Sequence, residues 1–383
     1  MERIFAGACM KVSGEIVYIH IYDIGGDIEV TKLEKIMNRL PEYQGLKHER
    51  TMPKYISITP SPIFVNLGKR KVKVLEKEFE VTVQTRIYSI GALTVILRFP
   101  FSDEFEELIK YSSPFKVIYQ GREMDLQRLS GIFAKKIVED MKESITPYYQ
   151  AEEKPELYTI FCISSIQNGN SPNEFIENHK NLITCLLREE RNLEKISSDE
   201  VSEALKYRVS YFNDDAAIID WGASLILEPS GKYEDYLLTI ELANLQLLEL
   251  RIYDRILDQK IDKAYADLRG LIMNPPLSWR KPAKVVMDIA QIRVEMTELI
   301  DNIRNITKFF GDWTLAKIYY SLSEKLHLKD WEGIIMNKLN TLEGLYETAS
   351  SRNDVYRSTL LETLILVLIA LEIAIMLLEL FRV

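Results

Sequence analysis

The chain has 383 residues, of which 47% are apolar and 27% are charged, and its formal net charge is -9 at pH 7. This length accommodates two domains, and the composition is that of a folded chain, which excludes a disordered protein. The negative charge argues against nonspecific binding of nucleic acid through a broadly basic surface. Three scattered cysteines are too few for a disulfide framework and suit reduced thiols.

Residues 1–148 are predicted to form a first, strand-rich α+β unit. β-Branched and aromatic residues recur there, often in alternation, which predicts strands over Glu15–Tyr22, Tyr55–Thr59, Lys71–Leu75, Phe79–Val83 and Ile87–Phe99. Helical spacing and turn signals predict helices near Val30–Leu40, Asp103–Tyr111 and Asp125–Ile145.

Residues 155–230 are predicted to form a second α+β unit after a short polar linker. Its first strand, Leu157–Ile163, is apolar enough along its length to be buried on both faces. Helices are expected over Pro172–Glu189 and after Ser198. Three more strands are expected near Tyr207–Phe212, Ala216–Trp221 and Ala223–Glu228.

Residues 231–357 are predicted to form a stalk of long antiparallel, coiled-coil-like helices. Apolar residues recur with helical spacing from Tyr233 to about Leu268 without an interrupting Gly or Pro, which predicts one long helix. Further helices are expected over Val285–Phe309, over Thr314–Leu326 and from Asp330 onward. In the last one a narrow apolar stripe predicts homo-oligomerisation through Trp331, Ile335, Leu339, Leu342 and Leu345.

Residues 358–383 are the most apolar part of the chain and are predicted to form a C-terminal transmembrane helix. About 20 apolar residues suffice to cross a bilayer core of roughly 30 Å. Arg352 and Arg357 precede the segment, which favours a single-pass, tail-anchored protein with its large N-terminal part in the cytoplasm. The alternative is a helix buried in the core of an oligomer. The residues that define the predicted membrane helix are Leu360, Leu364, Leu368, Leu371, Glu372, Ile375, Leu378 and Glu379.

Motifs for chemistry are absent from the sequence, which has no phosphate-binding glycine loop, nucleophile elbow or zinc-binding His-Glu-x-x-His. We therefore predict that the protein is not an enzyme and needs no cofactor, with no catalytic, cofactor-binding or metal-binding residues. The carboxylates closest together are Asp214, Asp215 and Asp220, which a turn and solvated strands also explain.

One dense basic run could bind an anionic partner, namely nucleic acid, a ribosome or lipid headgroups. The competing explanation is a solvated arm of a hairpin. The run consists of Lys69, Arg70, Lys71 and Lys73.

The strand pattern Ala216–Pro229, the long helix that follows and the apolar C-terminal helix together resemble the family named "required for meiotic nuclear division", a domain of unknown function. The resemblance covers roughly residues 155–383. It implies a membrane-anchored, homo-oligomeric, non-enzymatic protein, and mitochondrial members are linked to support of translation at the inner membrane. Residues 1–11 are not expected to form a transit peptide, and the chain carries an extra unit at residues 1–145, which points to a prokaryotic relative at the inner membrane.

The sequence therefore predicts a tail-anchored scaffold that homo-oligomerises through its stalk and anchor, with membrane lipid and an unidentified protein as partners. One alternative is a membrane-associated ligand sensor or enzyme that uses a pocket between the two α+β units. Another is a tether for RNA or a ribosome.

Overall fold

The computed structural model describes residues 10–39, 61–112, 114–147, 151, 154–167, 171–190, 192, 195–273, 287, 291, 294 and 313–380. The chain divides into two compact units. The first comprises Met1–Glu249 and Asn302–Lys329, and the second comprises Leu250–Asp301 and Asp330–Val383.

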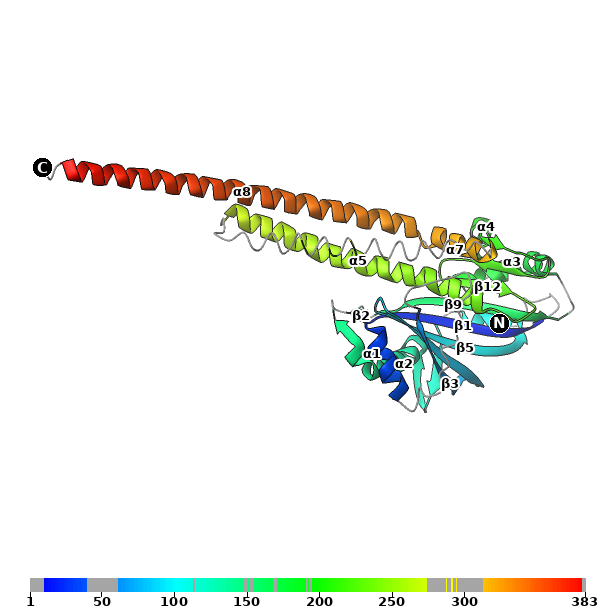
Figure 1. Cartoon of the computed structure of the whole chain (residues 1–383). Coiled ribbons are helices and arrows are strands. Elements are labelled where there is room, and N and C mark those ends of the chain that lie inside the picture. Colours follow the sequence, from blue (N-terminus) through cyan, green and yellow to red (C-terminus); the bar gives the residue numbers. More distant parts are fainter. Residues whose placement is uncertain are drawn as a thin grey trace. The chain divides into compact units, whose positions relative to one another are not determined.

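A ten-stranded sheet forms the centre of the first unit (Figure 1). The strand order is β10-β11-β12-β9-β1-β5-β4-β3-β6-β7. Its strands are β1 (Lys11–Asp23), β3 (Ile63–Val74), β4 (Lys77–Tyr88), β5 (Ala92–Glu104), β6 (Lys116–Tyr119), β7 (Arg122–Asp125), β9 (Glu156–Ile166), β10 (Arg208–Val209), β11 (Ala216–Ile219) and β12 (Ala223–Leu227). A separate two-stranded sheet pairs β2 (Gly26–Ile28) with β8 (Ile145–Pro147).

The central pairing joins β1 to β9. The two strands run antiparallel, with Tyr18 opposite Thr159, and β1 pairs with β5 on its other side. A bulge at Gly14 brings the backbones so close that a Cβ there would collide with the carbonyl of Cys162. The two predicted α+β units therefore share one sheet, and the predicted fold class of two such units is corrected to a mixed α+β fold built on that large sheet.

Helices cover both faces of the sheet. Apolar side chains on one face pack with those of α1 (Val30–Arg39), α2 (Leu126–Asp140), α3 (Pro172–Arg188) and the 3-10 helix η2 (Phe105–Tyr111). The other face meets the first part of α5 (Glu234–Met273) through Arg86 and Tyr88, and α7 (Trp313–Lys325) approaches β10 and β11. The short helices α4 (Ser198–Ala204) and η3 (Lys142–Ser144) complete this unit. Burial on both faces explains why β9 is apolar along its length.

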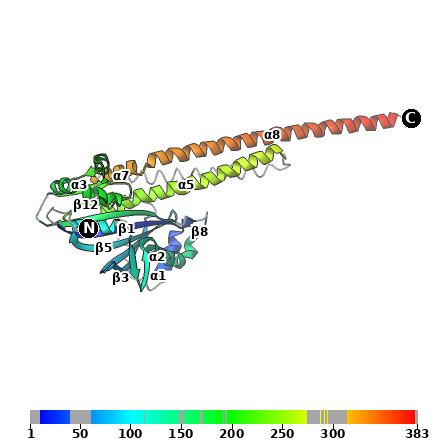
Figure 2. The ribbon, with the colours of Figure 1, turned by 180° about the vertical axis from the view of Figure 1, so that it is seen from behind.

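The described part of the second unit is a pair of helices. The end of α5, beyond Leu250, and the first half of α8 (Leu328–Leu380) run side by side in both views (Figures 1 and 2). Lys338 on α8 lies 2.6 Å from both Asp254 and Asp258 on α5. In the predicted oligomer stripe, Ile335, Leu339 and Leu342 are buried within the single chain, while Trp331 and Leu345 are partly buried.

The predicted membrane anchor is wrong. Within the residues that the structure describes, none of the helices combines the length and the apolar character that crossing a bilayer requires. Residues 358–380 are the last turns of the helix α8, and the charged residue Glu372 lies among the exposed apolar side chains from Leu361 to Leu377. The transmembrane part of the predicted fold class and the single-pass placement at an inner membrane are corrected accordingly, and the predicted contact with lipid stays a prediction.

Several predicted elements differ in detail from the structure. The predicted strand over Ile87–Phe99 is two strands, β4 and β5, which join at a turn where Gly91 has a φ of 86°. The predicted helix over Asp103–Tyr111 is the 3-10 helix η2. The predicted strand over Tyr55–Thr59 lies outside the described residues, as does most of the predicted helix over Val285–Phe309.

Candidate functional site

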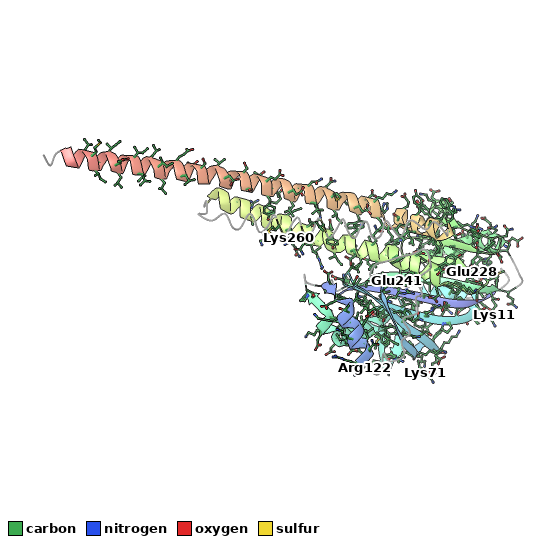
Figure 3. All side chains as sticks on the ribbon, in the orientation of Figure 1. Lys11, Lys71, Arg122, Glu228, Glu241 and Lys260 are labelled. Carbon is green, nitrogen blue, oxygen red and sulfur yellow. The ribbon has the colours of Figure 1, made fainter. Side chains whose placement is uncertain are left out.

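A buried ionic cluster fastens α5 to the sheet. Glu241 on α5 is fully buried, and its carboxylate accepts hydrogen bonds from Arg86 and, at 2.8 Å, from the Tyr88 hydroxyl. Figure 3 shows Glu241 on α5 beside the strands. The Arg86 guanidinium also lies 5.8 Å from the centre of the Phe64 ring. Because each charged group has partners, the cluster serves to position α5.

The cluster extends toward solvent through a second arginine. Arg98 on β5 donates to Glu15 on β1 at 2.5 and 3.0 Å and to Glu234 at the start of α5 at 2.5 Å. Burial disfavours the charged form of Arg86, but Glu241, Tyr88 and Glu234 together outweigh this effect and raise the pKa of Arg86. Burial raises the pKa of Tyr88 well above its ordinary value. The arginines therefore stay charged and Tyr88 stays neutral, as in a structural ion-pair network.

A second buried carboxylate, Asp220, lies at the end of β11. Its side-chain oxygens lie 2.8 Å from Arg188 Nε at the end of α3 and 3.1 Å from Lys325 Nζ at the end of α7. The Tyr158 hydroxyl donates to the Asp220 backbone carbonyl at 2.6 Å. Asp220 thus ties two helices to the sheet.

The three predicted aspartates do not form one site. Asp215 accepts hydrogen bonds from the backbone N–H groups of Tyr211 and Phe212, at 2.7 and 3.1 Å, and so holds a turn. Asp214 is exposed, while Asp220 belongs to the ion-pair cluster just described. The structure therefore gives these carboxylates turn and packing roles.

The predicted basic patch lies on β3 and faces glutamates on β4. Lys69 lies 2.8 Å from Glu80, and Lys71 lies 3.7 Å from Glu78. Arg70 donates to the Lys69 carbonyl, and Lys73 is opposite Glu78 in the strand register. Cross-strand pairing of this kind lowers the positive potential of the patch and favours the solvated-hairpin interpretation.

The described cysteines, Cys162 and Cys185, are buried free thiols. Burial raises the pKa of Cys185 to about 11, which disfavours the reactive thiolate. Among the described residues, no group of three or more His, Cys, Asp or Glu side chains is placed to hold a metal ion.

A cavity of about 250 Å³ lies beside β1, between the strand and the loops that flank η2, α2 and α3. His20, 4% exposed, lines it, and its Nδ1 has no hydrogen-bond partner among the described residues. Tyr18, Tyr111 and Phe115 form an aromatic wall. Sequence reasoning missed this cavity, although a histidine inside the apolar run of β1 is the signal that could have indicated it.

The far part of α8 presents the largest exposed apolar surface among the described residues. Each apolar residue longer than alanine between Leu361 and Leu377 is 47% to 71% exposed. Figure 3 shows side chains standing out along this red end of the helix. Of the predicted membrane-helix residues, Leu364, Leu368, Leu371 and Ile375 belong to this surface, Glu372 is exposed among them, and the side chains of Leu360, Leu378 and Glu379 lie outside the described set.

Comparison with known proteins places the sheet in a defined family. Residues 13–234 match the family model described as "Uncharacterized protein MJ0711, N-terminal domain". The chain is also similar to "Uncharacterized protein MJ0711" of Methanocaldococcus jannaschii, with 28% identity over 225 residues, which cover 59% of this chain and 67% of that protein. No solved structure matches the chain.

The family match bears on the resemblance drawn from the sequence. It runs from β1 into the start of α5 and so spans the whole ten-stranded sheet. Neither match names the "required for meiotic nuclear division" family, so that resemblance stays a prediction. Because the family model matches more than half of the chain, the protein belongs to the family of the MJ0711 N-terminal domain.

Proposed function

We propose that the protein is a self-associating, non-enzymatic scaffold in which copies of α8 pack together through the surface from Leu361 to Leu377. The observation that carries this proposal is the exposure of that surface. Its twelve large apolar residues, each about half exposed, add up to on the order of 1,000 Å² of apolar area, more than the about 300–600 Å² of the largest patch on an ordinary monomer. One partner in a standard specific interface contributes roughly 800 Å².

The spacing of these residues favours other copies of the same helix as the occupant. Leu361, Leu364, Leu368, Leu371 and Ile375 alternate by three and four positions, which is the spacing of a coiled-coil seam. Apolar residues also occupy the outer positions, for example Leu366 and Ile373. A helix with apolar residues on every face is stable in water only when other protein segments bury it on all sides. An assembly of more than two helices satisfies this requirement better than a pair.

The proposal uses residues beyond the predicted stripe, since Ile335, Leu339 and Leu342 are already buried within one chain. Each copy would then contribute one sheet unit of the MJ0711 N-terminal type to the assembly. The closed ion-pair clusters of the sheet unit, which position helices, are consistent with a scaffold.

The test is the mass of the full-length protein in solution, measured by light scattering over a concentration series. We expect a multimer of three or more chains. The triple variant Leu364→Lys, Leu368→Lys and Leu371→Lys should be monomeric, because these side chains are exposed in the single chain and the new charges would lie in the seam.

The matched control is Ile132→Lys on α2, which changes a 44% exposed apolar residue elsewhere and should leave the mass unchanged. A monomeric wild-type protein at about 100 μM would overturn the proposal, as would a triple variant that keeps its mass. The proposal would likewise be overturned if the protein sedimented with phosphatidylglycerol vesicles but did not self-associate when the vesicles were left out.

A further inference from the structure

Three features of the cavity beside His20 favour a positively charged ligand. Two carboxylates, Asp125 and Glu189, stand at its exposed edge. The described lining residues include no lysine or arginine. These two carboxylates favour a cationic ligand over an anionic one.

Aromatic side chains form the deeper wall and are fixed by their own contacts. The Tyr18 hydroxyl donates to the Tyr111 carbonyl at 2.7 Å, and the Phe115 ring lies 5.8 Å from Tyr18 and 6.0 Å from Tyr111. Ring faces attract cations within about 6 Å of their centres. The aromatic wall therefore favours a positively charged ligand, as the two carboxylates do.

His20 lines the cavity and carries a buried nitrogen that is available as an acceptor. Its Nδ1 lacks a partner among the described residues although the side chain is only 4% exposed, and a buried polar atom without a partner is costly unless a ligand or water satisfies it. Burial lowers the pKa of His20 to about 4, so the imidazole is neutral at pH 7 and does not repel a cation. In the tautomer that is protonated on Nε2, Nδ1 accepts a hydrogen bond from an N–H donor.

We propose that this cavity is a binding site for a small organic ammonium ion, which donates to His20 Nδ1, contacts the aromatic wall and is balanced by Asp125 and Glu189. The volume of about 250 Å³ is equivalent to roughly eight water molecules at about 30 Å³ each, which sets the ligand at about ten non-hydrogen atoms. The site lies in the family-defining sheet unit and does not depend on the self-association proposed for α8.

The test uses three probes that share a ring and differ in charge: benzylamine, benzyl alcohol and benzoate. Calorimetric titration of the full chain at pH 7 should show binding of benzylamine, at least tenfold weaker binding of benzyl alcohol, and no binding of benzoate. Absence of benzylamine binding at 10 mM, or equal binding of benzoate, would overturn the proposal.

Variants locate the site. The double variant Asp125→Asn and Glu189→Gln keeps side-chain size, and an asparagine still caps α2, where Asp125 accepts from the Arg128 N–H at 2.6 Å. It should weaken benzylamine tenfold or more and leave benzyl alcohol unchanged. His20→Phe should also weaken benzylamine. Glu177→Gln, an exposed charge change on α3 outside the cavity, is the matched control. Unchanged benzylamine affinity in the double variant would refute the assignment.

Discussion

The sheet unit and the far part of α8 each depart from the usual rule that charged residues are exposed and large apolar residues are buried. The sheet unit buries charged groups, Glu241, Arg86 and Asp220, each beside a partner of opposite charge. The far part of α8 instead exposes leucines and isoleucines from Leu361 to Leu377. The buried charges have their partners within one chain, whereas in the proposed assembly other copies of α8 cover the exposed apolar side chains. The two regions should therefore respond differently to mutation: the first in folding stability, the second in association.

The largest expected effect is on the buried ion pair. Glu241→Ala leaves Arg86 charged and buried without its carboxylate, which should lower the free energy of unfolding by about 3–5 kcal/mol. The pair Arg86→Met and Glu241→Leu should recover most of that loss, because it removes both charges. Urea unfolding measures both variants.

The control for this prediction is Glu234→Ala, which removes a carboxylate that is 49% exposed from the same network. Exposed ion pairs contribute about 0–1 kcal/mol, so its effect should be small. Equal losses for Glu241→Ala and Glu234→Ala would contradict the view that burial makes Arg86–Glu241 the stronger constraint.

The second prediction concerns His20, a buried titratable residue of the sheet unit. Its Nδ1 lacks a partner among the described residues. Its pKa is about 4 in the folded chain and near 6.5 when exposed, so the unfolded chain binds the extra proton between these values. The contribution of neutral His20 to the free energy of unfolding is fully present above about pH 6.5, and about 3 kcal/mol of it should be lost as the pH drops to 4. His20→Phe should remove this part of the acid sensitivity, measured as the difference in urea midpoint between pH 7 and pH 4.5. The same slope in both proteins would contradict the neutral, buried histidine.

The sequence predicted local structure better than it predicted long-range pairing. The apolar run of β9 and the uninterrupted apolar spacing of α5 indicated a buried strand and a long helix, and the structure has both. The linker near Pro155 suggested a boundary, yet β1 and β9 pair across it. Composition carries no information on which strands meet, because register depends on partners distant in sequence.

The sites show the same limit. Glu241 looks ordinary in the sequence, Asp220 stands out only as one of three neighbouring aspartates, and His20 only as a histidine in an apolar run. Their roles arise when other strands and helices surround them. The apolar end of α8 was recognised from composition, but composition alone does not separate a membrane span from a helix that packs on other helices. The basic run on β3 was noticed as well, whereas its partners Glu78 and Glu80 follow from the hairpin register.

A smaller effect, on self-association, is expected from changing Glu372 on α8. It flanks the seam formed by Leu368, Leu371 and Ile375, so association would bring a carboxylate close to the apolar core of the bundle, which is costly without a partner. Glu372→Leu should tighten self-association by about tenfold, equivalent to about 1.4 kcal/mol. Dilution in analytical ultracentrifugation measures the change. Glu347→Leu, an exposed charge nearer the start of α8, is the control and should leave association unchanged.

The smallest effect is expected on the sheet surface, where charge pairs are solvated. Lys69 and Glu80 are 2.8 Å apart but their side chains are 63% and 59% exposed. Solvent screens such a pair, and ordering two long side chains offsets much of the attraction, so Lys69→Ala should change the free energy of unfolding by less than about 1 kcal/mol. The same urea titration as for Glu241→Ala gives the comparison directly. A loss from Lys69→Ala as large as that from Glu241→Ala would mean that pairing across β3 and β4, rather than burial under α5, holds the sheet unit together.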